Sequence, residues 1–142
     1  MSTQKWLILH AALLIAAGMV FLLYSPLVIT GLGFDQLVQD SEGYWAMVSF
    51  ARLFGVALTA WGLTILGGER FASAVQSAEG ASLRGILGAV TVGDFLGAFS
   101  AAIQAASVWG LPSSWSLSLG FTLLGAISLW VLWRQSKLGR KD

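Results

Sequence analysis

The sequence predicts an all-α integral membrane protein, a four-helix bundle with antiparallel up-down topology and both termini on the cytoplasmic side. Of its 142 residues, 56% are hydrophobic and 11% are charged, whereas soluble domains average about 25% charged residues. Crossing a bilayer core of roughly 30 Å takes about 20 apolar residues per helix. Four stretches meet this requirement. We expect one domain over residues 1–142, with spans at about residues 6–30, 44–66, 86–109 and 115–133.

Glycine and proline residues mark the expected ends of these spans. Pro26 comes late in the first span and should bend its last turn. Gly110 and Pro112 separate the last two spans by a short loop, which makes them antiparallel neighbours. The stretch after Lys5 resembles a signal peptide. Its apolar run continues to Ile29, however, so we expect a retained helix.

The positions of lysine and arginine predict the orientation. Seven of the eight basic residues fall at the two termini or between the second and third spans: Lys5, Arg70, Arg84, Arg134, Lys137, Arg140 and Lys141. The first loop has no basic residue and carries Asp35, Asp40 and Glu42. Because cytoplasmic loops carry the excess of Lys and Arg, we expect a multi-pass protein of the inner (plasma) membrane with both termini cytoplasmic.

Tryptophan and tyrosine residues lie near the expected span ends, where amphipathic rings favour the membrane interface. Trp6, Trp61, Trp130 and Trp133 fall on the cytoplasmic side, and Tyr44, Trp45, Trp109 and Trp115 fall on the outer side. We therefore expect two aromatic belts.

Small residues predict how the helices pack, because helices in lipid associate through close backbone approach and interhelical hydrogen bonds. In the third span, Gly93, Gly97, Ala101 and Ala105 recur at every fourth position, and Gly55 lies in the second span. We expect the third span at the centre of the bundle, against the second and fourth spans. The outer faces of the first and fourth spans should meet lipid or a partner protein.

Few groups inside the spans carry chemistry. Ionisable residues in a membrane are costly, about 2.5–3.5 kcal/mol each on insertion scales, and are candidates for function. Arg52, Asp94 and His10 are of this kind, and Gln104 adds a polar group. We expect Arg52 and Asp94 to pair, as a structural cluster or as a proton or substrate relay. The alternatives are that Arg52 extends to the acidic loop and that Asp94 is a neutral acid bonded to a backbone carbonyl.

No cofactor and no catalytic or metal-binding residues are expected. A single histidine excludes a haem held by two histidines, and there is no cysteine. His10 is expected to be a polar interfacial residue, with a ligand to a pigment or quinone as the alternative. Zinc-protease, serine-hydrolase, P-loop and dinucleotide motifs are absent. The net charge of +1 offers no basic patch for nucleic acid.

Three segments carry a resemblance to a group of proteins: ARLFGVALTAWGLTILGGER, LRGILGAVTVGDFLGAF and WGLPSSWSLSLGFTLLGAISLWVLW. In them an arginine opens a glycine-rich second span and a polar residue marks the third. In this respect the chain resembles small four-span bacterial integral membrane proteins of uncharacterised function. The resemblance covers most of the chain and implies no activity.

Short loops and scarce chemistry lead to the functional expectation. We expect a non-catalytic accessory or scaffold subunit of a larger membrane complex, with an energy-transducing complex as one candidate. Its partners would be the lipid bilayer and other membrane subunits or further copies of the chain. The alternative is a protein that binds or transports a small amphiphile, such as a lipid or quinone, with Arg52 and Asp94 in its cavity. We rate a membrane enzyme below both.

Overall fold

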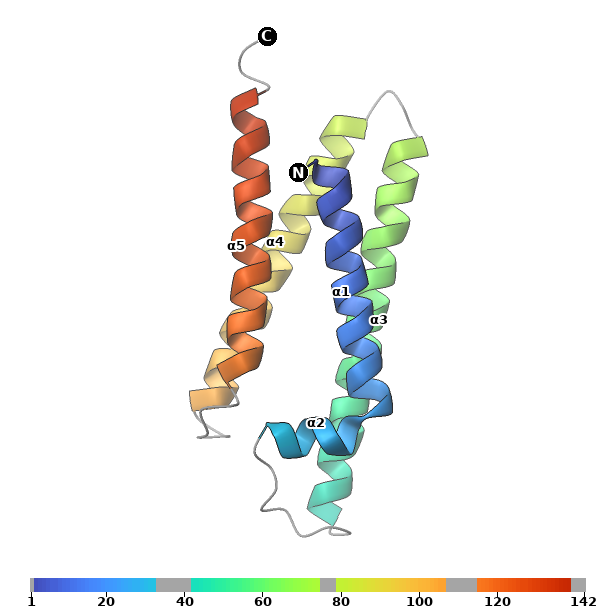
Figure 1. Ribbon diagram of the computed structural model, residues 1–142, viewed down its shortest axis with the longest axis vertical. Coiled ribbons are helices and arrows are strands. Elements are labelled where there is room, and N and C mark those ends of the chain that lie inside the picture. The colour runs from blue at the N-terminus through green and yellow to red at the C-terminus, as the bar shows by residue number, and fades with distance from the viewer. Residues whose placement is uncertain (1, 33–41, 75–78, 107–114, 139–142) are drawn as a thin grey trace.

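The computed structural model describes residues 2–32, 42–74, 79–106 and 115–138. Within these ranges the chain forms five α-helices (Figure 1): α1 (Thr3–Leu23), α2 (Ser25–Gly31), α3 (Glu42–Ala74), α4 (Glu79–Gln104) and α5 (Trp115–Leu138). Of these, α1, α3, α4 and α5 are long and apolar enough to cross a membrane. The prediction of an all-helical protein with four long apolar helices is therefore confirmed.

The long helices lie side by side in two pairs. α1 packs along α3 and α4 packs along α5, while α1 also contacts α2, α4 and α5. In Figure 1 each long helix runs opposite to the one before it, and α1 begins at the same end at which α5 finishes. α4 is tilted, so it starts beside α1 and α3 and finishes beside α5. We call the end with Lys5, Arg70, Arg84 and Arg134 the basic end, and the opposite end the α2 end.

The largest buried core surrounds the first half of α1. Its members come from all four long helices and include Trp6, Leu7, Ala11, Leu14, Leu58, Ile65, Leu87, Val90 and Val131. The outward faces of the helices are also apolar, and Leu53, Leu96 and Phe99 are each more than 60% exposed. Apolar surface of this extent suits lipid acyl chains rather than water.

Glycines bring α1 and α3 into backbone contact. A Cβ atom added at Gly55 would lie 2.6 Å from the carbonyl oxygen of Gly18 and 2.7 Å from the backbone nitrogen of Leu22. A Cβ atom at Gly62 would lie 2.8 Å from the carbonyl oxygen of Ala11. Such contacts give close van der Waals packing, which replaces the missing hydrophobic drive in lipid. The small residues of α3 therefore serve its contact with α1.

The first span is shorter than the sequence predicts. α1 ends at Leu23, and α2 turns away across the end of the bundle instead of continuing to Thr30 (Figure 1). In an unbroken helix the backbone nitrogen of Pro26 would face the Leu22 carbonyl, but proline has no N–H to donate. The hydroxyl of Ser25 donates to that carbonyl instead, at 3.4 Å. The proline therefore breaks the helix where we expected only a bend.

The α1–α3 contact leads to a test with matched glycine variants. Gly55→Ala should lower the free energy of unfolding by about 1–3 kcal/mol, because the new methyl group meets backbone atoms that cannot move aside. Gly67→Ala in the same helix is the control, since a Cβ atom there meets nothing within 4 Å. Thermal unfolding of both variants in mild detergent measures the difference. Equal melting temperatures would contradict the tight α1–α3 contact.

Candidate functional site

The structure separates the four polar residues predicted within the spans into three places. His10 in α1 meets Asp94 in α4, and both side chains are almost completely buried. Arg52 in α3 bonds to Ser25 at the start of α2. Gln104 lines a cavity near the end of α4. The expected contact between Arg52 and Asp94 is not formed, because each has a different partner.

The His10–Asp94 pair joins the two helix pairs in the interior. Nε2 of His10 lies 3.2 Å from Oδ1 of Asp94. This is ion-pair distance, but the ring nitrogen is not aligned for a hydrogen bond. Nδ1 of His10 and Oδ2 of Asp94 are also buried and have no hydrogen-bond partner among the described residues. Buried polar atoms without partners are uncommon in proteins and call for an explanation.

Two further polar contacts lie near this pair on α1. The indole N–H of Trp6 donates to the hydroxyl of Ser128 in α5 at 2.9 Å, and the Trp6 ring meets the His10 ring edge-on. The side-chain amide of Gln4 donates to Glu69 in α3 at 2.9 Å. Trp6 is therefore buried inside the bundle, and our expectation that it belongs to an interfacial belt was wrong.

Arg52 holds the break between α1 and α2. Its Nε donates to the buried hydroxyl of Ser25 at 3.2 Å, and this same hydroxyl donates to the Leu22 carbonyl. The arginine side chain is otherwise exposed on α3. This arrangement ties the start of α2 to α3. Arg52 therefore has a positioning role at the helix break.

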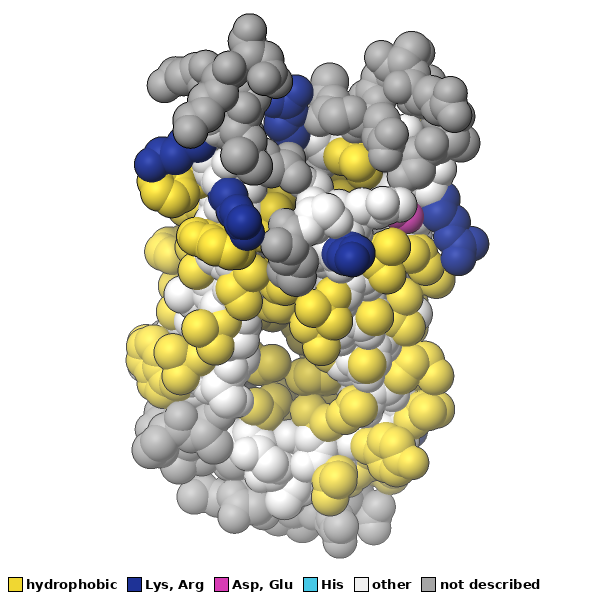
Figure 2. All heavy atoms as spheres, turned by 45° about the horizontal axis from the view of Figure 1, so that its top comes forward, with side chains coloured by type: hydrophobic (Ala, Val, Ile, Leu, Met, Phe, Trp, Pro, Cys, Tyr) yellow, Lys and Arg dark blue, Asp and Glu magenta, His cyan; other side chains and the backbone are white. Residues whose placement is uncertain are grey.

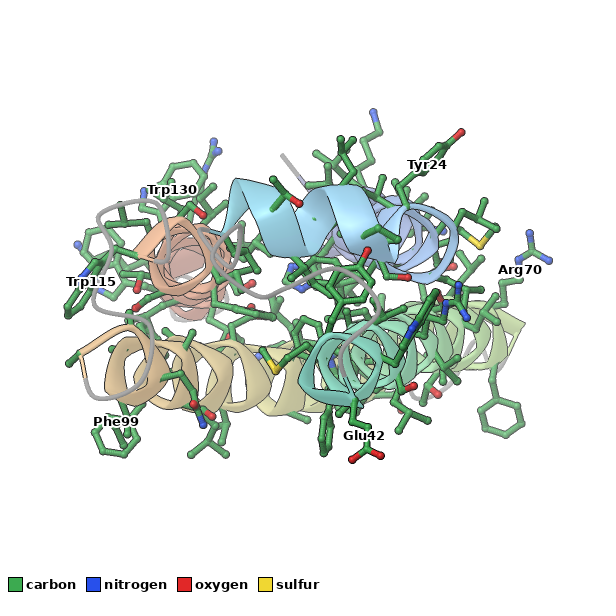
Figure 3. The ribbon with its side chains drawn as sticks, turned by 90° about the horizontal axis from the view of Figure 1, so that it is seen from below. Tyr24, Glu42, Arg70, Phe99, Trp115 and Trp130 are labelled. Atoms are coloured by element: carbon green, nitrogen blue, oxygen red, sulfur yellow. The ribbon has the colours of Figure 1, made fainter. Side chains whose placement is uncertain are left out.

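A cavity of about 550 Å³ lies between the two helix pairs toward the α2 end. Ligand pockets commonly measure about 300–1,000 Å³. All five helices contribute to its wall, which consists of Phe21, Ile29, Leu32, Met47, Phe50, Ala51, Phe54, Gly97, Ser100, Ala101, Gln104, Leu117 and Phe121. Seen from the α2 end, α2 runs across the space between the two pairs (Figure 3). Among the residues that the structure describes, the wall contains no charged side chain, and Ser100 and Gln104 supply its polar side-chain groups.

A second hollow of about 390 Å³ lies between α1 and α5. It is lined by Leu13, Leu14, Ala17, Phe21, Leu58, Ser116, Leu117, Gly120, Phe121, Leu123, Leu124 and Ile127. Figure 2 shows this face of the molecule hollowed between the two helices. Phe21, Leu117 and Phe121 line both spaces. These three side chains therefore form the partition between an open apolar hollow and the cavity.

The predicted packing residues serve several different contacts. Gly55 meets α1, as described above. A Cβ atom at Gly93 would lie 3.3 Å from the Trp61 ring, and one at Gly97 would lie 3.1 Å from the Phe121 ring. Ala101 is buried in the cavity wall, and Ala105 is also buried. Because Gly97 has no side chain, the Phe121 ring can pack directly against α4.

The position of His10 concerns the alternative prediction that this residue is a ligand to a pigment or quinone. Its ring is fully buried and lines neither cavity. In the part of the chain that the structure describes, no group of three or more metal-ligating side chains is gathered. Sequence reasoning did not predict the polar contacts of Ser25, Glu69 and Ser128, and it assigned Trp6 to the interface rather than to the interior. Glu69 carried a signal, as an acid just beyond a predicted span.

Comparisons with protein-family models, with curated proteins and with solved structures found no match to this chain. The cavity and the buried His10–Asp94 pair are therefore the features from which its function has to be inferred. The cavity offers volume and an apolar wall. The buried pair offers titratable groups in a region of low dielectric.

The partner assignments predict two different double-mutant cycles. His10→Leu and Asp94→Leu each remove one side of a buried contact, so the double variant should be more stable than the sum of the single losses implies. We expect a coupling energy of about 0.5–3 kcal/mol. Arg52→Leu combined with Asp94→Leu should give additive losses, because these residues do not meet. Unfolding in detergent measures both cycles, and the reverse pattern would restore the Arg52–Asp94 pair.

Proposed function

We propose that this protein binds a small uncharged amphiphile in the membrane, within the cavity between its two helix pairs. The observation that carries this proposal is the cavity itself, with about 550 Å³ of space and a wall drawn from all five helices. An apolar space of this size next to an open hollow offers a place for part of a lipid-soluble molecule. Of the two roles expected from the sequence, this geometry favours amphiphile binding, although neither Arg52 nor Asp94, which we expected in the cavity, lines it.

The chemistry of the wall favours a neutral ligand. A charged headgroup would lose its hydration in the cavity and find no opposite charge among the described lining residues, which is costly. The amide of Gln104 and the hydroxyl of Ser100 can instead bond to a carbonyl or hydroxyl group. Four phenylalanine rings, Phe21, Phe50, Phe54 and Phe121, offer flat surfaces to a ring or chain. Quinones and neutral lipids combine these properties.

The hollow between α1 and α5 supplies the route of entry in this proposal. It opens on a face that is largely apolar (Figure 2). An amphiphile in the bilayer would reach the cavity from the side, after the rings of Phe21 and Phe121 move. Both rings are half-buried, and their movement requires side-chain rotation rather than the slower motion of whole helices. Binding therefore needs no passage through water.

We further propose that the protein lies in the inner (plasma) membrane as an antiparallel bundle with its basic end in the cytoplasm. Figure 2 shows Lys and Arg side chains gathered around that end. Arg134 lies over the Trp130 ring and Lys137 over the Trp133 ring, at 5.6 and 3.8 Å from the ring centres. Basic and aromatic residues together are typical of the cytoplasmic interface. Both termini would then be cytoplasmic.

An accessory role in a larger complex is our second proposal. A ridge of exposed apolar side chains follows α4 and consists of Val92, Phe95, Leu96, Phe99 and Ile103. Phe99 points away from the bundle (Figure 3). Another membrane subunit, or a second copy of the chain, could pack on this ridge while the cavity stays occupied. Purification from the native host in mild detergent, with identification of the co-eluting proteins, tests this role.

Reporter fusions test the orientation. A reporter that is active only outside the cytoplasm should be silent when fused after Asp142 and active when inserted near Gln39. The reason is the excess of Lys and Arg at the basic end. A cytoplasmic reporter at the same two positions is the control and should give the opposite pattern. Activity of the first reporter at Asp142 would overturn the proposed orientation.

Blocking the cavity tests the binding function. We expect an alkyl benzoquinone to bind the purified protein, and Ala101→Phe should weaken this binding about tenfold or more, equivalent to about 1.4 kcal/mol. Ala60→Phe is the matched control, because Ala60 is exposed on α3 and does not line the cavity. Gln104→Leu should weaken binding about three- to tenfold through loss of one hydrogen bond. Isothermal titration calorimetry measures these affinities.

The choice of ligand gives a second arm of the same experiment. An alkyl sulfate and an alkyl ammonium of equal chain length should bind more weakly than the quinone. Equal binding of all three would show that the apolar chain alone is recognised. Unchanged quinone affinity in Ala101→Phe would mean that the cavity is not the site.

A further inference from the structure

We propose that the buried His10–Asp94 pair is a proton-binding site whose occupancy is linked to amphiphile binding in the cavity. This inference rests on the proposed binding function and adds a second ligand, the proton. The polar contacts between the two helix pairs are concentrated at one end of the bundle. Across the interior, α1 is linked to α4 by His10–Asp94 and to α5 by Trp6–Ser128. Both links lie toward the basic end, whereas the cavity lies toward the α2 end.

The unpartnered atoms of the pair indicate a site for protons. Nδ1 of His10 and Oδ2 of Asp94 are buried without hydrogen-bond partners among the described residues. Each of these two atoms can gain or lose a proton without breaking a hydrogen bond to another described residue. A proton also needs no cavity, and neither cavity is lined by His10 or Asp94. The hydroxyl of Thr3 is a third buried atom without a partner. It lies two turns from His10 on α1, about 10 Å toward the basic end.

The number of bound protons decides whether the bundle interior is charged. With two protons the pair is neutral overall, as histidinium with carboxylate or as imidazole with carboxylic acid. Loss of one proton leaves a net negative charge, and gain of one leaves a net positive charge. A net charge in the membrane interior costs a few kcal/mol. A change in proton number therefore alters the energy of the contact that holds α1 against α4.

Other titratable groups lie toward both ends of the packed helices. Toward the basic end they are Lys5 on α1, Glu69 and Arg70 on α3, Arg84 on α4, and Arg134 and Lys137 on α5. Toward the α2 end they are Glu42, Tyr44 and Arg52 on α3. Glu69 accepts a bond from Gln4, which places it about 9 Å from His10 along α1. Arg84 lies about 15 Å from Asp94 along α4. Asp94 is therefore the acid that faces His10 directly, and Glu69 is the nearest competitor for a linked proton.

The link to the cavity is geometric. Gly97, Ala101 and Gln104 line the cavity on α4, one to three turns beyond Asp94 on the same helix. On α1, Phe21 lines it three turns beyond His10. A ligand that enters between these walls changes the separation of α1 and α4 at the α2 end. Because helices are stiff, the contact between His10 and Asp94 must respond, and with it the affinity for protons.

Calorimetry of quinone binding tests the inference. The purified full-length protein is titrated with an alkyl benzoquinone in two buffers of different ionisation enthalpy, which gives the number of protons exchanged. The probe has no titratable group, so any proton comes from the protein. We expect wild-type protein to exchange a measurable fraction of one proton when the quinone binds. Its affinity should change with pH, up to about tenfold per pH unit for one linked proton.

Variants then assign the proton to the pair. Asp94→Asn should bind the quinone without proton exchange, and His10→Gln serves the same purpose if Asp94→Asn does not fold. Glu69→Gln and Glu42→Gln should keep the wild-type exchange. Quinone binding by the wild type without proton exchange would overturn this inference and leave the binding function standing. Proton exchange that survives both Asp94→Asn and His10→Gln would overturn it as well. Absence of quinone binding to the wild type would overturn the binding function and the inference together.

Discussion

Polar side chains in the first half of α1 contact each of the other long helices, and the packing of the bundle depends on these contacts. Gln4 meets Glu69 on α3, Trp6 meets Ser128 on α5, and His10 meets Asp94 on α4. In a bilayer the hydrophobic effect does not draw helices together, so directed polar contacts and close backbone approach decide which helices pair. α1 combines both, because Gly18 also brings its backbone against α3.

The cavity follows from the same distribution of contacts. The polar contacts that join α1 to α4 and to α5, His10–Asp94 and Trp6–Ser128, lie toward the basic end. Toward the α2 end, α4 tilts away from α1 and α3 and remains beside α5, held by the bond from Ser118 to the Ala98 carbonyl. The break at Pro26 turns α2 across the resulting space. A continuous first span would not have placed α2 across this space. Pro26, which breaks the span, and Arg52, which holds the start of α2, therefore shape the cavity through the position of α2.

The sequence was sufficient to predict the number and composition of the long helices, because length and hydropathy report directly on the bilayer. It was also sufficient to single out His10, Arg52, Asp94 and Gln104 as unusual. It could not assign their partners. Hydropathy treats Trp6 as an interfacial ring and Pro26 as a bend, whereas burial of the indole and the full break depend on tilt and on neighbouring helices. The partner of Asp94 depends on which helix α4 crosses, and that is a tertiary property.

The two features of the candidate site are chemically complementary. The cavity has space and, among its described lining residues, no charge, whereas the His10–Asp94 pair has titratable groups and lines neither cavity. If either were the whole site, the other would be hard to explain: buried atoms without partners destabilise a bundle, and an apolar cavity gives up packing contacts. A bundle that retains both is consistent with selection for function at some expense of stability. The shared helices α1 and α4, which carry the pair and line the cavity, are the physical connection through which one would influence the other.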